Sequence, residues 1–343
     1  MKNERTKPDM PELRKDPIVD RWVIIAQERG KRPADFASPT VNSQAGFCPF
    51  CLGNESKTPQ EILALRPNGS GPNESGWSLR VVPNKYPALT IEGGIDRVGE
   101  GMYDKMNGIG AHEVIIEGSC HEVALEELPE RAVQETLWAF QQRIIDLKRD
   151  PRFRYILVFK NHGEAAGATL EHTHSQLVAL PIVPELVLEE LDGARRHYEY
   201  KERCIYCDII AQERGDGRRV VMENHDFIAV CPYAPRFPFE TWILPKYHSA
   251  HFEHDSTEAL AGAANILKDV LLKLRMVCNQ PPYNFVLHNS TVQSKHSAYF
   301  HWHIEIMPKL TKLAGFEAGT GFHINPVSPE EAADILRACT VHP

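Results

Sequence analysis

Long apolar runs are missing from this chain of 343 residues. Nowhere do about 18 consecutive apolar residues occur, which is the length that a membrane-spanning helix needs. The opening residues, MKNERTKPDM, also lack the apolar core of a secretory signal. The sequence therefore predicts a cytoplasmic protein that makes no use of a membrane.

Positive charge is scarce as well. The chain has 38 Lys and Arg against 46 Asp and Glu, which gives a formal net charge of −8. Proteins whose main partner is a nucleic-acid backbone carry a basic surface, so we expect no nucleic-acid partner. A local basic pocket for one small phosphorylated ligand is still compatible with this charge. The remaining composition, 42% hydrophobic and 24% charged, is that of a globular protein long enough for two domains.

Cysteine is too sparse for a disulfide framework, because only eight occur in the whole chain. Four of them form two C-x-x-C pairs, Cys48 with Cys51 in FCPFCLGNE and Cys204 with Cys207 in RCIYCDIIA. Such a pair points two thiolates at one place, as tetrahedral zinc requires. A redox pair is the alternative, but that motif normally opens a helix after a strand, and one chain seldom carries two with histidines after each.

The chain repeats itself. Each C-x-x-C pair is followed by a β-rich run that ends in histidine, HEVIIEGSCH at His121 and ETWILPKYH at His248. An amphipathic helix is expected next in each case, at residues 124–149 and 256–277, and then a strand and an H-x-H motif. YILVFKNHGEAAGATLEHTHSQ from residue 155 aligns without a gap with NFVLHNSTVQSKHSAYFHWHIE from residue 284, an offset of 284 − 155 = 129. An internal duplication is the economical explanation.

The repeat predicts an α+β fold of two tandem halves, residues 1–182 and 183–343, each with several strands and a long helix. The charged segment PELVLEELDGARRHYEYKER should form a surface helix between them. A zinc finger is excluded, because 121 − 51 − 1 = 69 residues separate Cys51 from His121, far more than the ~12 of a finger.

Two H-x-H motifs are present, His172 with His174 and His301 with His303. Side chains at i and i+2 of a strand face the same side, so such a pair can bind one metal or divide its work between a metal and a substrate. Two histidines of an ordinary hairpin are the alternative. Gln176 lies one more step along the same face, where its amide can donate to a phosphoryl oxygen or simply lie exposed.

The order C-x-x-C, His, N-x(10)-H-x-H-x-Q and a second H-x-H resembles the galactose-1-phosphate uridylyltransferase branch of the histidine triad superfamily. The likeness runs from DPIVDRWVIIAQERGKRP at residues 16–33 to the C-terminal GFEAGTGFHINPVSPEEAA. In that family the second histidine of the first H-x-H attacks the α-phosphorus of a nucleoside-diphosphate sugar. A sugar 1-phosphate or phosphate then collects the nucleotide from the nucleotidyl-histidine. The resemblance implies that His174 is the nucleophile and that both halves are histidine-triad-like, each an antiparallel sheet with a long helix. It also implies that the chain forms a homodimer whose sites draw on both subunits.

The resemblance also implies a zinc ion held by Cys48, Cys51, His121 and His172. The second site, Cys204, Cys207, His248 and His301, resembles that of two-zinc members, among which are plant enzymes acting on ADP-glucose. His251 is an alternative ligand to His248; we prefer His248 because 301 − 248 = 53 is close to 172 − 121 = 51. We therefore expect two zinc ions per chain. Four protein ligands leave no metal-bound water, so each zinc should orient a strand rather than perform chemistry.

Further site residues follow from the family's pattern. These are Arg29 and Arg32 for phosphate, Asn84 for the nucleoside, Asn161 and Thr169 for sugar or phosphate, Lys312, Phe316 and Glu317 for the acceptor sugar, and His323 where galactose-using enzymes present a glutamine. A bidentate guanidinium suits a diphosphate, although solvated surface charges are the plain alternative for both arginines.

The chain also departs from the family's pattern. Well-known uridylyltransferases have Pro and Gly where this chain has Thr173 and Ser175. In the second H-x-H motif Glu305 takes the position of the glutamine, and its negative charge would repel a phosphoryl group. His303 is accordingly expected to be a structural or substrate-side histidine, with a second nucleophile as the alternative.

We predict a nucleotidyltransferase that moves a nucleoside monophosphate, UMP first, between a nucleoside-diphosphate hexose and a hexose 1-phosphate, as in galactose metabolism. Transfer of AMP from ADP-glucose to phosphate is the alternative within the same chemistry. Hydrolysis of nucleotides or dinucleoside polyphosphates, in which water discharges His174, is an alternative of another class. A zinc-stabilised nucleotide-binding module without activity is the third. The sequence leaves the base, the acceptor and the direction open.

Overall fold

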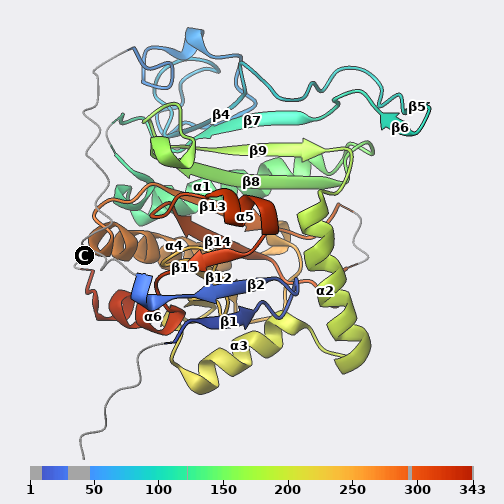
Figure 1. Ribbon diagram of the computed structural model, residues 1–343. Helices are drawn as coiled ribbons and strands as arrows, with labels where there is room; N and C mark the ends of the chain where they lie inside the picture. The colour runs from blue at the N-terminus through green and yellow to red at the C-terminus, as the bar shows by residue number, and fades with distance from the viewer. Residues whose placement is uncertain (1–9, 30–46, 122, 293–295, 342–343) are drawn as a thin grey trace, which may run out of the picture.

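The computed structural model describes residues 10–29, 47–121, 123–292 and 296–341. Its main element is a ten-stranded sheet in the order β10-β11-β12-β14-β13-β8-β9-β7-β4-β3 (Figure 1). Every pair of neighbours in it is antiparallel. The strands are β3 (Leu63–Leu65), β4 (Leu79–Pro83), β7 (Ala111–Ile116), β8 (Tyr155–His162), β9 (His174–Leu180), β10 (Val220–Glu223), β11 (Phe227–Val230), β12 (Thr241–Pro245), β13 (Tyr283–His288) and β14 (His303–Pro308).

The strand order of the sheet shows the same repeat as the sequence. Outward from its middle, where β8 pairs with β13, the order is β8-β9-β7-β4-β3 on one side and β13-β14-β12-β11-β10 on the other. Each half thus contributes five strands in the same order, and the two sets form one continuous sheet. The α+β class is confirmed. The proposed boundary at residues 182 and 183 falls between β9 and α2 (Glu185–Lys201), and the division into two domains stays a prediction.

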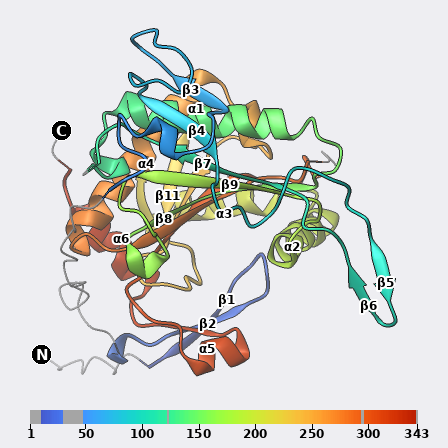
Figure 2. The ribbon, with the colours of Figure 1, turned by 90° about the horizontal axis from the view of Figure 1, so that it is seen from above.

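The two long helices lie on one face of the sheet. α1 (Glu130–Leu147) and α4 (Thr257–Val277) pack against each other and against the strands in the largest apolar core (Figure 2). The expected helix at residues 124–149 begins later than predicted, because Pro129 occupies its N-cap and residues 125–127 form a separate 3₁₀ turn. No helix among the described residues combines the length and apolarity needed to cross a bilayer.

The opposite face differs between the halves. In the C-terminal half it is covered by α2 and α3 (Ile205–Asp216), which pack with Ile18 on β11 and β12. A small sheet of β1 (Glu12–Lys15), β2 (Trp22–Ile25) and β15 (His323–Asn325) lies on the same side, with α5 (Gly315–Thr320) and α6 (Pro329–Ala338) completing the C-terminal region (Figure 2). In the N-terminal half the face is instead covered in part by the segment around Cys48 and Phe50. The two H-x-H motifs therefore have different surroundings.

A hairpin of β5 (Val98–Glu100) and β6 (Tyr103–Lys105) extends from the body of the molecule (Figures 1 and 2). All six of these strand residues are exposed. The hairpin takes no part in the ten-stranded sheet.

Candidate active site and metal clusters

The first predicted ligand set comes together in space. Cys48, Cys51, His121 and His172 place their ligand atoms within 4.8 Å of one another. The Cys51 sulfur lies 3.3 Å from Nδ1 of His121 and 3.7 Å from Nδ1 of His172. Zinc bonds of about 2.3 Å to sulfur and 2.05 Å to nitrogen, at tetrahedral angles, place the two ligand atoms about 3.6 Å apart. The donor set and its spacing therefore fit a zinc ion.

The second set is equally compact and consists of Cys204, Cys207, His248 and His301. The Cys207 sulfur lies 3.4 Å from Nδ1 of His248 and 3.7 Å from Nδ1 of His301. His251 is directed elsewhere, because its Nδ1 is close to Lys148 and Glu253. Of the two histidines that the sequence left as alternatives, the structure places His248 in the cluster.

The hydrogen bonds made by Nε2 of two cluster histidines also support a metal at each cluster. Nε2 of His172 donates to the Gly118 carbonyl at 2.7 Å, and Nε2 of His301 donates to the Pro245 carbonyl at 2.9 Å. Metal-binding histidines usually donate their second ring N–H in this way, which leaves Nδ1 unprotonated for the metal.

One expectation about the C-x-x-C pairs needs correction. The sequence argument assigned a helix-opening C-x-x-C to redox chemistry, yet Cys204 is the N-cap of α3 and Cys207 lies in its first turn. This pair opens a helix because α3 has to cover the C-terminal half of the sheet, where Ile205, Tyr206 and Ile210 enter the core. The nearby histidines, rather than the local backbone, distinguish the cluster from a redox pair.

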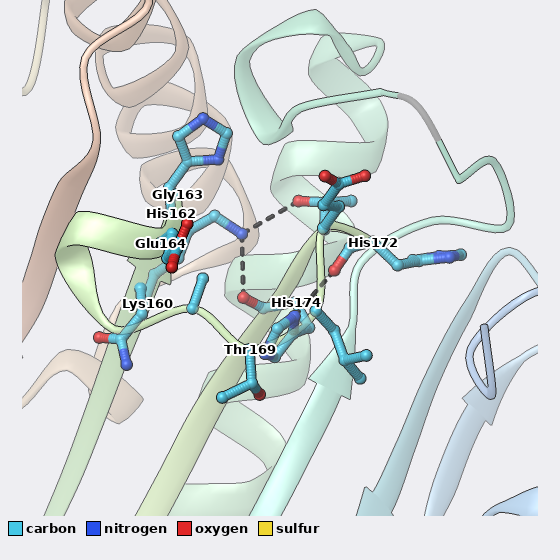
Figure 3. A pocket seen from close by; sticks show the side chains of 12 residues that line it. Lys160, His162, Gly163, Glu164, Thr169, His172 and His174 are labelled. Carbon is cyan, nitrogen blue, oxygen red and sulfur yellow. Dashed lines mark hydrogen bonds between the residues drawn. The ribbon is translucent and has the colours of Figure 1, made fainter. Parts of the chain in front are cut away.

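His174 opens β9 and is held through one ring nitrogen. Its Nδ1 donates to the backbone oxygen of His172, the first histidine of the same motif, at 2.8 Å (Figure 3). Phe50 packs edge-on against the ring, with the centroids 5.4 Å apart. Burial, assisted by the nearby Lys160 charge, lowers the pKa of His174, which favours the neutral ring. A neutral imidazole with Nδ1 bound offers Nε2 as the nucleophile.

Two cavities meet at His174. The first, here called the loop cavity, has a volume of about 290 Å³ and lies beside the loop after β8. Its lining includes Lys160, Asn161, His162, Thr169 and His174. The second, the β4 cavity, has a volume of about 310 Å³, and its lining includes Phe50, Lys57, Asn84, Tyr86, Thr169, His174 and Gln176. Four of the residues expected to contact substrate, Asn84, Asn161, Thr169 and Gln176, therefore line cavities that His174 also lines.

A buried ion pair that sequence reasoning missed supports the nucleophile's strand. Nζ of Lys160 contacts the Glu117 carboxylate. It also donates to the backbone oxygen of His174 at 3.0 Å (Figure 3). The hydroxyl groups of Thr173 and Ser175 both donate to the Glu117 carboxylate. Burial opposes ionisation of Glu117, but Lys160 and these hydroxyls hold its pKa below the ordinary value. Thr173 and Ser175, which stand where well-known uridylyltransferases have Pro and Gly, thus share one partner, Glu117.

His303 repeats the backbone contact of His174 but not its surroundings. Its Nδ1 donates to the His301 oxygen at 3.1 Å, and its ring stacks on His288 with the centroids 4.5 Å apart. The cavity beside it has a volume of only about 60 Å³. Although burial opposes ionisation, Arg236 and His288 hold the pKa of Glu305 well below its ordinary value. A negative carboxylate therefore lies near His303, and the cavity there is much smaller than either cavity beside His174.

Four of the remaining predicted residues do not line the cavities beside His174 within one chain. Lys312, Phe316, Glu317 and His323 line neither of the two cavities. His323 belongs to β15, which pairs with β2, and its ring packs against Phe237. Arg29 ends a 3₁₀ turn, but its side chain lies outside what the structure describes, as does Arg32 altogether.

Comparison with known proteins is consistent with this geometry. Residues 2–184 match the family model "Galactose-1-phosphate uridyl transferase, N-terminal domain", and residues 134–340 match a domain of unknown function, DUF4921. ADP-glucose phosphorylase of Arabidopsis thaliana is 38% identical over 95% of this chain and 92% of its own length. Galactose-1-phosphate uridylyltransferase of Thermotoga maritima is 31% identical over 97% of this chain and 99% of its own.

Solved structures of proteins with these activities are similar to this chain over nearly its whole length. The crystal structure of the Arabidopsis thaliana ADP-glucose phosphorylase with bound ADP-glucose superposes with a TM-score of 0.82 at 36% identity, covering 97% of this chain and all of that one. A uridylyltransferase structure gives a TM-score of 0.75 at 28% identity, with 96% and 98% covered. These relatives are nucleotidyltransferases, and this chain belongs to the galactose-1-phosphate uridylyltransferase family.

Proposed function

We propose that the protein transfers a nucleoside monophosphate from a nucleoside-diphosphate hexose to a phosphate or sugar-phosphate acceptor through a covalent bond to His174. The observation that carries the proposal is the placement of this side chain. Its Nδ1 is bound to the His172 oxygen, and the residue lines both the loop cavity and the β4 cavity.

The reaction has two steps. Nε2 of His174 attacks the α-phosphorus; a P–N bond forms, and the bond to the bridging oxygen breaks, so hexose 1-phosphate leaves with that oxygen. An acceptor phosphate oxygen then attacks the same phosphorus, and the P–N bond breaks. In both steps the Nδ1–H of His174 remains hydrogen-bonded to the His172 carbonyl. This bond stabilises the positive charge that the ring carries in the intermediate. Lys57 and Lys85, which also line the β4 cavity, place positive charge near the phosphates.

Zinc is the metal we propose for both clusters. When bound, it would fix the orientation of His172 and His301 and so brace the strands that begin at His174 and His303. Four side chains would hold each ion and leave no position for a water molecule, so the reacting groups are those of the chain itself.

ADP-glucose with phosphate is our first candidate pair of substrates, because the 38% identical relative is named ADP-glucose phosphorylase. The products would be ADP and glucose 1-phosphate. UDP-glucose with galactose 1-phosphate, the pair favoured by the sequence motifs, is the second, and the 31% identical uridylyltransferase of Thermotoga maritima supports it. Incubation with ADP-glucose or UDP-glucose alone, followed by phosphate or galactose 1-phosphate, decides between them. A strong preference for the uridine pair would overturn the first candidate and leave the histidine mechanism in place.

We also propose that the protein acts as a homodimer. Lys312, Phe316 and Glu317 lie in a largely exposed segment that lines neither cavity beside His174. A second subunit could supply these residues to the acceptor, as the family resemblance implies. Each active site would then contain His174 of one subunit and the 312–323 segment of the other.

A further inference from the structure

His112 lies on β7, next to the strand that carries His174, and both of its ring nitrogens have neighbours. Nδ1 accepts a hydrogen bond from the backbone N–H of Ala88 at 3.2 Å. A backbone N–H can only donate, so this ring nitrogen carries no proton. In the neutral ring the proton therefore resides on Nε2.

The Nε2–H of His112 has one acceptor within reach among the residues that the structure describes. It lies 2.8 Å from Oε1 of Gln176. The amide nitrogen of Asn84 lies 3.2 Å from the same ring nitrogen, but it is a donor and cannot accept the proton. The orientation of that amide is fixed in turn, because Oδ1 of Asn84 accepts from the Tyr86 backbone N–H at 2.9 Å. Donation from Nε2 of His112 to Gln176 satisfies the contacts with Ala88 and Gln176, and the Asn84 amide, itself a donor, makes no hydrogen bond to that nitrogen.

The direction of this bond determines which end of Gln176 faces a ligand. With Oε1 occupied by His112, the side chain presents its NH₂ group to the β4 cavity, which His174 also lines. The terminal torsion of glutamine is broad and roughly two-fold, so an untethered amide would also present its oxygen. An amide oxygen repels a phosphoryl oxygen, whereas the NH₂ group donates to it.

We propose that His112 is a positioning residue that fixes Gln176 as a hydrogen-bond donor to a non-bridging oxygen of the α-phosphoryl group. The proposal rests on the function proposed above. His112 touches no reacting atom and acts only through Gln176. An oriented donor at this position stabilises charge that develops on the phosphoryl group as the P–N bond forms.

The bonding of His112 can be tested without any reaction. Nitrogen-15 NMR of the zinc-loaded protein, labelled at histidine and glutamine, should show His112 protonated at Nε2, with its signals shifting in Gln176→Ala. Protonation of His112 at Nδ1 would overturn the proposal even if the protein is an active transferase. If the protein forms no nucleotidyl adduct, the proposed function fails, and this spectrum still tests the contact.

A double-mutant cycle tests the role in catalysis. We expect His112→Phe and Gln176→Ala each to slow formation of the nucleotidyl adduct from ADP-glucose or UDP-glucose about 100-fold, a typical loss for one oriented donor. The affinity for the nucleotide sugar should change little. The double variant should be no slower than Gln176→Ala, because His112 has no other route to the reaction. His225→Phe, at an exposed surface position, is the matched control and should leave the rate unchanged.

Gln176→Glu separates orientation from packing. The carboxylate can still accept from His112, but it cannot donate to a phosphoryl oxygen, so its loss should match or exceed that of Gln176→Ala. An unchanged rate in His112→Phe would contradict the proposal. The proposal would also be contradicted if the rate loss of the double variant equalled the product of the two single losses. Independent losses would mean that His112 does not act through Gln176.

Discussion

Lys160 and Glu117 form a fully buried ion pair directly beside the backbone of the proposed nucleophile, with side-chain exposures of 1% and 0%. Replacing Glu117 by Gln would leave the Lys160 ammonium buried without its counter-charge. We expect a loss of about 3–5 kcal/mol in the free energy of unfolding, the usual cost of breaking a buried pair. Urea denaturation of the zinc-loaded protein measures this loss.

Two further variants show whether the charge is the cause. Glu117→Gln combined with Lys160→Met removes both charges and should recover most of the stability. Glu100→Gln breaks the exposed pair between Lys105 and Glu100 and should cost no more than about 1 kcal/mol. Equal losses in Glu117→Gln and Glu100→Gln would contradict the importance assigned to the buried pair.

Metal content should follow the two clusters. Protein purified without added metal should contain two zinc ions per chain, and Cys48→Ser and Cys204→Ser should each lose one, because a thiolate ligand is removed. The free energy of unfolding should decrease when the metal is lost, since zinc binding contributes folding free energy. Cys120→Ser is the control, because this exposed cysteine lies beside His121 but belongs to neither cluster. Elemental analysis checks all three.

The second cluster offers a matched pair of histidines. His248→Ala should lose the second zinc ion, whereas His251→Ala should retain it, because only His248 is in the cluster. Zinc retained in His248→Ala but lost in His251→Ala would reverse this ligand assignment. A wild-type protein without zinc, or with Cys48 and Cys204 freely alkylated, would exclude structural metal sites altogether.

Motifs predicted the parts of the site whose residues are close in sequence or repeat at a fixed spacing. The offset of 129 residues between the aligned segments anticipated the matching strand orders, and the similar spacings before His172 and His301 selected His248. Metal ligands are also restricted to a few residue types, which makes their patterns specific.

The supporting contacts could not be predicted in the same way. Glu117 and Lys160 are 43 residues apart, and each ends an apolar strand run that gives no sign of its partner. The bond between His112 and Gln176 depends on the register of β7 against β9, which no local motif specifies. The helix formed after Cys204 was missed because its cause is the burial of apolar side chains on the distant sheet.

Acid should destabilise the protein partly through His162. Burial, with a contribution from the Lys160 charge, lowers the pKa of His162 from 6.5 to about 4. Between these values the unfolded chain binds a proton that the folded protein does not, so stability falls as the pH decreases from 6.5 toward 4. His162→Phe keeps a ring to stack on Tyr283 and should lose less stability than the wild type between pH 7 and pH 5. Thermal unfolding at the two pH values measures the difference, and an equal loss would contradict it.

The proposed homodimer predicts complementation between inactive variants. His174→Ala lacks the nucleophile, and Lys312→Ala combined with Phe316→Ala lacks the acceptor segment. After the two proteins are mixed, dissociated and reassembled, hybrid dimers should contain one intact site, which restores up to about a quarter of the wild-type activity if subunits pair at random. No recovery, despite hybrid dimers seen by native mass spectrometry, would place the segment and His174 in the same subunit.

The central claim, that His174 carries the nucleotide, is tested most directly by intact-protein mass spectrometry after incubation with ADP-glucose, and separately with UDP-glucose, in the absence of an acceptor. The wild-type protein should gain one nucleoside monophosphate, and peptide mapping should place it on His174 as an acid-labile adduct. His174→Ala should gain none while retaining its zinc and its thermal stability. His172→Ala should instead have less zinc and a lower thermal stability, because it lacks a metal ligand. A His174→Ala protein that still forms the adduct and transfers the nucleotide rapidly would contradict the account.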